Sequence, residues 1–121
     1  MGRGGEEVIR ALGAFGGGFG GNGEVCGALV GGIATIGLKF SRSREEEKED
    51  PRMWAYAHEF FDRFRDEIVK DHGGISCRAI VNVDWRDREQ VKSFYSGDKR
   101  LECRRIVGEA AKLLGELLER A

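Results

Sequence analysis

Residues 16–40 read GGGFGGNGEVCGALVGGIATIGLKF, and they hold the most informative pattern of the chain. Six of the eight residues in 16–23 are glycine. Such a run predicts a loop with positive φ angles or very close backbone approach, because glycine alone adopts these conformations freely. Residues 24–40 are apolar on nearly every side, which predicts a buried central helix. Within it, Gly27 and Gly31 form a GxxxG spacing, so one face allows another backbone to pack closely.

The remainder of the chain predicts further helices around this one. The helical patterns, in chain order, are residues 5–15, 51–71, 86–95 and 99–120. Asp50-Pro51 is a typical helix start, whereas residues 75–83 fit either a short helix or a strand. Residues 41–50 (SRSREEEKED) are a charged linker. We therefore expect an all-α fold, a single domain over residues 1–121, with four or five helices packed around the buried glycine-rich helix.

Two of these predicted helices carry a defined apolar face. The face of residues 51–71 comprises Trp54, Ala57, Phe61, Phe64 and Ile68, with Phe60 alongside. The face of residues 99–120 comprises Leu101, Cys103, Ile106, Val107, Ala110, Leu114 and Leu117. Both faces are expected to turn toward the core.

Composition excludes several classes of function. The chain of 121 residues has a net charge of -1 and alternates basic with acidic side chains, so we expect no nucleic-acid partner. Glu24 divides the most apolar stretch into uncharged runs of 13 and 14 residues. Each run is shorter than the roughly 20 residues that cross a bilayer. No membrane span is therefore predicted.

The chain has three cysteines, Cys26, Cys77 and Cys103. No CxxC pair occurs, which disfavours a thioredoxin-type pair, a zinc ribbon and a c-type haem site. An odd number of cysteines argues against a secreted disulfide scaffold, and no basic-then-apolar signal peptide opens the chain. The simplest predicted compartment is a reducing cytoplasm.

Cys26 has the most favourable setting for chemistry. If the helix begins near Glu24, Cys26 lies in its first turn, where unpaired N–H groups and the helix dipole favour a thiolate with a lowered pKa. The glycine loop lets backbone amides approach a sulfur, a cluster or an anion. The candidate cofactor-binding residues are Gly20, Gly21, Gly23 and Gly27. The alternative is that Cys26 and Cys103 are small core residues, since free cysteine is often buried.

The glycine loop and the residues Cys26-Gly27-Ala28-Leu29-Val30-Gly31 resemble the family of redox-active proteins named for the pattern C-GCAxxG-C-C. Downstream, Cys77 in ISCRAI and Cys103 in ECRRIVGEAAKLL resemble the third and fourth cysteines of that family. Family members carry a further cysteine on a helix before the glycine loop, and residues 1–25 contain none. The resemblance implies redox chemistry at Cys26, Cys77 and Cys103.

Three functions remain open at this point. The first is thiol–disulfide or electron-transfer chemistry by the three cysteines, as in a thiol-dependent oxidoreductase that serves a redox partner protein or a small thiol. The second is a metal or iron–sulfur site with Cys26, Cys77 and Cys103 as ligands and His72 in the fourth position. The third is a non-enzymatic homo-oligomeric interaction module, with the GxxxG strip or the aromatic face of residues 54–64 as its interface.

Overall fold

The computed structural model describes residues 5–121, and this part of the chain is all-helical, without a strand. The α-helices are α1 (Glu6–Leu12), α2 (Gly27–Phe40), α3 (Arg52–Arg63), α4 (Cys77–Val81), α5 (Arg88–Ser96) and α6 (Lys99–Glu119). The all-α class is confirmed, and six α-helices replace the predicted four or five. The additional one is α4, which forms in the segment whose pattern left helix and strand open.

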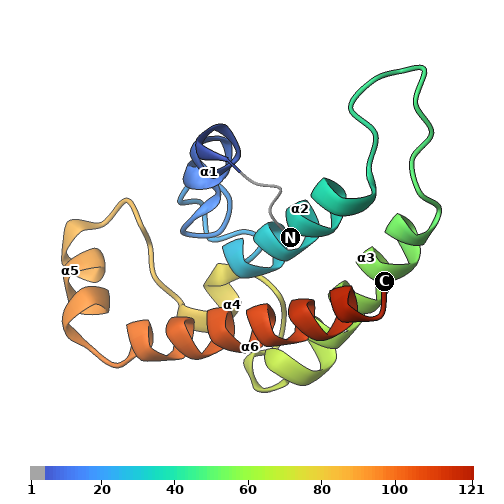
Figure 1. Cartoon of the computed structure of the whole chain (residues 1–121). Coiled ribbons are helices and arrows are strands. Elements are labelled where there is room, and N and C mark those ends of the chain that lie inside the picture. The colour runs from blue at the N-terminus through green and yellow to red at the C-terminus, as the bar shows by residue number, and fades with distance from the viewer. Residues whose placement is uncertain (1–4) are drawn as a thin grey trace.

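Figure 1 shows how these helices are arranged. α6 runs along one side of the molecule, α2 lies across from it, and α5 lies beyond the N-terminal end of α6. α2 packs against both α3 and α6. It buries Leu29, Gly32, Ile36 and Phe40, and its other positions are half-buried. The glycine-rich helix thus has one fully buried face rather than being enclosed on every side.

Gly32 is a point of close contact between α2 and α3. A Cβ atom placed on Gly32 would lie 2.2 Å from the ring of Phe60, which is itself fully buried. The small-residue strip of α2 therefore admits an aromatic ring rather than a second backbone at this point. By contrast, a Cβ atom placed on Gly31 would meet no neighbouring atom within 4 Å.

The predicted helix of residues 51–71 is α-helical only as far as Arg63. It continues as a π turn over Phe64–Ile68 and ends in a 3-10 turn over Lys70–His72, followed by Gly73 at a φ of 77°. The wider π turn lets Phe64, Ile68 and Val69 all reach the core. Trp54 was predicted on the buried face, but it is 55% exposed and its indole Nε1 donates to Glu49.

The charged segment 41–50 connects α2 to α3. It forms no helix and projects away from the other helices (Figure 1). At its end, Asp50 Oδ1 accepts a hydrogen bond from the backbone N–H of Arg52 at 2.9 Å. Asp50 therefore caps α3, as its position before Pro51 predicts. Across the described residues, no helix combines the length and the apolar character that crossing a bilayer requires.

Candidate functional site

The glycine loop is a nearly continuous run of left-handed backbone. Five of its glycines have φ between 63° and 76°, and Phe19 between them has a φ of 68°. This run turns the chain back on itself, so the N–H of Glu24 donates to the carbonyl of Gly18 at 2.8 Å. The predicted positive φ angles are confirmed.

Gly18 places this loop directly on a cysteine. A Cβ atom on Gly18 would lie 2.5 Å from the Cβ atom of Cys77, closer than real side chains approach. Gly18 is buried and Cys77 is 8% exposed. The loop backbone therefore covers the Cys77 side chain, and only glycine fits there.

A short antiparallel pairing brings Cys26 and Cys77 together. Val25 pairs with Ser76, the N–H of Cys26 donates to the carbonyl of Ile75 at 2.9 Å, and the N–H of Cys77 donates to the carbonyl of Glu24 at 2.6 Å. Cys26 thus stands opposite Ile75, two residues from Cys77. Such diagonal neighbours share one face of the pairing, with roughly 7–8 Å between their Cα atoms, so a bond between the two sulfurs requires the backbone to move closer by about 1 Å.

All three cysteines line one cavity of about 450 Å³. Cys26 precedes α2, Cys77 begins α4, and Cys103 lies in the first third of α6. Aromatic and aliphatic residues complete the walls, including Phe15, Ile80, Trp85, Phe94 and Ile106. The thiols are free, with Cys77 buried and the other two half-buried. The cysteines that are far apart in the sequence therefore converge.

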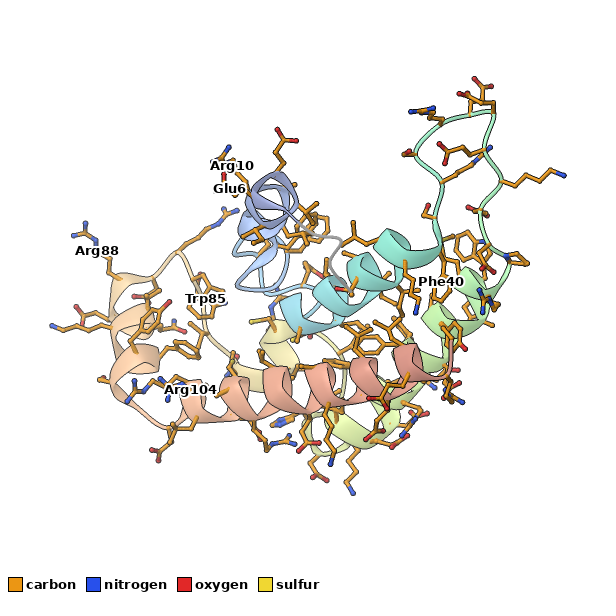
Figure 2. All side chains as sticks on the ribbon, viewed as in Figure 1. Glu6, Arg10, Phe40, Trp85, Arg88 and Arg104 are labelled. Atoms are coloured by element: carbon orange, nitrogen blue, oxygen red, sulfur yellow. The ribbon has the colours of Figure 1, made fainter. Side chains whose placement is uncertain are left out.

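Trp85 is a site residue that sequence reasoning missed. It lies on the connection between α4 and α5 and points into the space between α5 and the other helices (Figure 2). Its indole Nε1 donates to Cys77 Sγ at 3.4 Å. Its ring packs edge-on against Phe94, with 4.9 Å between the two ring centroids. A single aromatic residue between two helical patterns carries no signal that would connect it with a cysteine eight residues earlier.

Burial raises the pKa of the Cys26 thiol, contrary to the predicted lowering. Cys26 is the residue before α2 rather than part of its first turn. Hydrogen bonds from the backbone N–H groups of Ala28 and Leu29 lower its pKa, as the helix start predicts, but loss of solvent has the larger effect and nearby Cys77 raises the pKa further.

The pKa of the Cys103 thiol is also raised. Burial is the main cause that raises its pKa from 9.0 to about 11, and Cys77, Cys26 and Glu102 add to the effect. The cavity therefore favours neutral thiols at Cys26 and Cys103 near pH 7. Cys77 acts on the pKa of both other cysteines.

His72 does not join the cysteines. Its Nε2 lies 3.0 Å from a carboxylate oxygen of Glu102, and it does not line the cavity of the three thiols. Within residues 5–121, no group of three or more His, Cys, Asp or Glu side chains is arranged to hold a metal ion. The described side chains are thus not arranged as the ligands of a metal ion or cluster.

The four candidate cofactor-binding glycines are divided between different places. Gly27 lines the thiol cavity, where its backbone lies against the carbonyl oxygen of Phe15. Gly21 and Gly23 line a separate groove, together with Arg78 and Arg86. Gly20 is exposed and lines neither.

A comparison with protein families bears on this arrangement. The family model described as "Putative redox-active protein (C_GCAxxG_C_C)" matches residues 1–117. The chain belongs to this family. No curated protein and no solved structure matches the chain. Cys26, Cys77 and Cys103 all line the same cavity in this family member.

Proposed function

We propose that this redox-active family member is a thiol–disulfide redox protein, in which two of Cys26, Cys77 and Cys103 form a reversible disulfide. The observation that carries the proposal is the single cavity lined by all three free thiols. Cys77 is the shared neighbour, because it raises the pKa of Cys26 and raises the pKa of Cys103 more than Cys26 does.

The reaction begins at a half-buried thiol and ends at the buried one. The Cys26 thiolate attacks one sulfur of a substrate disulfide RSSR, which releases RS⁻ and leaves a Cys26–S–S–R mixed disulfide. The Cys77 thiolate then attacks the Cys26 sulfur and releases the second RS⁻. Both leaving groups take up the two protons that the protein thiols lost. In sum, the protein dithiol and RSSR give a protein disulfide and two RSH, with two electrons transferred to the substrate.

The three thiols differ in access, which supports this order. Cys26 and Cys103 are half-buried, whereas Cys77 is 8% exposed beneath Gly18. A small disulfide meets Cys26 or Cys103 first, and Cys77 resolves the mixed disulfide from inside the cavity. Cys103 is then the alternative entry thiol.

Thiol counting tests the proposal. The protein is equilibrated in buffers of graded dithiothreitol redox potential, its free thiols are alkylated, and the disulfide is located by peptide mass mapping. We expect the native protein to lose two of three thiols reversibly, with Cys77 in the bridge. Three thiols that remain free in the native protein under oxidising conditions would refute the proposal.

Serine variants identify the two cysteines that form the disulfide, and metal analysis distinguishes the disulfide from a metal site. Cys77→Ser should abolish the intramolecular disulfide, whereas Cys103→Ser should retain the Cys26–Cys77 bridge and serves as the matched control. Visible absorption and metal analysis are run on the same protein purified without oxygen. Stoichiometric iron with a cluster absorption band would favour the metal alternative over the disulfide.

A further inference from the structure

The thiol cavity has walls without charge. Among the residues that the structure describes, none of those that line it has an ionisable acidic or basic side chain other than the three thiols and the Tyr95 hydroxyl. At its rim, Tyr95 is 63% exposed and Val107 is 57% exposed. Exposed apolar residues at the mouth and aromatic residues within are typical of a small-molecule pocket.

The neighbouring groove has the opposite character. It measures about 920 Å³, shares Trp85 with the thiol cavity, and is lined by Arg78, Arg86, Glu24 and Asp84. Its arginines already have partners, because Arg86 donates to Asn22 Oδ1 at 2.8 Å and Arg78 lies 3.7 Å from Glu24. Charged side chains therefore gather outside the thiol cavity and not in it.

We propose that the thiol cavity binds an uncharged, apolar small molecule, and that the disulfide substrate of this protein is consequently uncharged rather than a charged peptide disulfide such as glutathione disulfide. The second part rests on the proposed thiol–disulfide function. The physical reason is desolvation: a carboxylate that enters this cavity loses water and finds no cationic side chain among the described wall residues. An uncharged aromatic or aliphatic molecule gains contact with Phe15, Trp85 and Phe94 instead.

The redox step is a two-electron exchange between the protein dithiol and the substrate disulfide. An uncharged RSSR takes two electrons from two protein thiols, one S–S bond breaks in the substrate, one forms in the protein, and both protons leave as two RSH. The neutral thiols at Cys26 and Cys103 suit this ligand, since they add no charge to the cavity before the reaction.

Binding is measured independently of redox chemistry. N-phenyl-1-naphthylamine is an uncharged fluorescent probe, and 1-anilinonaphthalene-8-sulfonate has the same ring system with one negative charge. We expect the uncharged probe to bind with roughly ten-fold higher affinity than the anion. A protein with all three cysteines replaced by serine should retain this preference. Equal or tighter binding of the anion, or no binding of either probe, would overturn the cavity proposal.

A pair of α6 variants locates the probe. Val107→Glu places a carboxylate at the rim of the cavity, whereas Leu101→Glu places one at another exposed position of the same helix that does not line the cavity. Affinity for the uncharged probe should fall roughly ten-fold in Val107→Glu and stay unchanged in Leu101→Glu. Equal effects of both substitutions would show that the probe binds elsewhere and would refute the assignment.

Reaction rates test the substrate class. The uncharged 4,4′-dithiodipyridine is compared with the dianionic 5,5′-dithiobis(2-nitrobenzoate), and each rate is divided by the rate with urea-unfolded protein. We expect folding to favour the uncharged disulfide by roughly ten-fold over the dianion. A preference for the dianion would refute the substrate class. Probe binding without any reversible protein disulfide would refute the redox function while leaving the cavity proposal standing.

Discussion

Gly18 combines two constraints at one residue. Its φ of 76° lies in the left-handed region, and its Cα faces the Cβ atom of Cys77 at a distance that excludes a side chain. Gly73 has nearly the same φ, 77°, but nothing lies within 4 Å of a Cβ placed there. The same substitution at both glycines therefore distinguishes the cost of backbone strain from the cost of the contact with Cys77.

We expect Gly18→Ala to lower the free energy of unfolding by more than Gly73→Ala does. Gly73→Ala should cost about 1 kcal/mol from backbone strain alone, and Gly18→Ala about 1–3 kcal/mol more from displacement of Cys77. Urea unfolding of both variants measures the difference. Equal losses would contradict the contact between the loop and Cys77.

The thiol of Cys103 should react slowly at neutral pH. Because its pKa is about 11 rather than 9.0, its thiolate fraction near pH 8 should be roughly 100-fold lower than that of an ordinary thiol. Alkylation of Cys103 by iodoacetamide, followed by mass spectrometry from pH 7 to 11, measures this. Since Cys77 raises the pKa of Cys103, Cys77→Ser should move the midpoint to lower pH. A midpoint at or below pH 9 in the parent protein would contradict the burial argument.

The same pKa makes stability depend on pH. The folded chain holds the Cys103 proton more tightly than the unfolded chain, because the pKa is about 11 folded and 9.0 unfolded. This contribution to the free energy of unfolding is present below pH 9 and is lost as the pH rises through about 11. Urea unfolding of the parent and of Cys103→Ser, compared from pH 8 to 11, should show a steeper loss in the parent. Parallel pH profiles would contradict it.

At the scale of the helices, α2 shows how adjacent positions with the same residue have opposite roles. Gly31 is open, whereas Gly32 accommodates the ring of Phe60. Sequence spacing groups both in one small-residue strip, and only the position of α3 distinguishes them.

This difference predicts opposite effects of the same substitution. Gly31→Ala should raise the free energy of unfolding by up to about 1 kcal/mol, because alanine favours the helix and meets nothing. Gly32→Ala should lower it by about 1–3 kcal/mol, because the new methyl group displaces Phe60. Thermal and urea unfolding of the pair measure both. Stabilisation by Gly32→Ala would contradict the packing of α2 on α3.

The apolar face of α6 was only partly predictable. The buried positions are Ile106, Ala110, Leu113 and Leu117. The predicted stripe omits Leu113, and two of its members, Leu101 and Val107, are 50% and 57% exposed. The sequence shows a broad apolar sector on α6, and the neighbouring helices decide which edge of that sector they cover. Here the uncovered edge at Val107 borders the thiol cavity.

At the scale of the whole molecule, the proposed disulfide joins distant parts of the chain. Cys26 and Cys77 are 51 residues apart in the sequence, and the intervening chain contains α2 and α3. Oxidation should therefore stabilise the fold by up to about 4 kcal/mol, because closing a loop of this length restricts the unfolded chain.

Unfolding with and without dithiothreitol measures that stabilisation. The oxidised parent protein and oxidised Cys103→Ser should both unfold at higher urea concentration than their reduced forms. Cys26→Ser should lose this difference. An equal difference in Cys26→Ser would place the bridge between Cys77 and Cys103 instead.

The all-α class, the left-handed glycine loop and the family of the chain were predictable from the amino-acid sequence alone. These features depend on local properties: helical periodicity, the φ freedom of glycine, and residue identity along the chain. That Cys26, Cys77 and Cys103 line one cavity, and that Trp85 donates to Cys77, follows only from how the helices pack. This packing also reversed the expected pKa shift of Cys26, because desolvation depends on which helices cover a thiol, whereas the effect of a helix start can be inferred from the sequence alone.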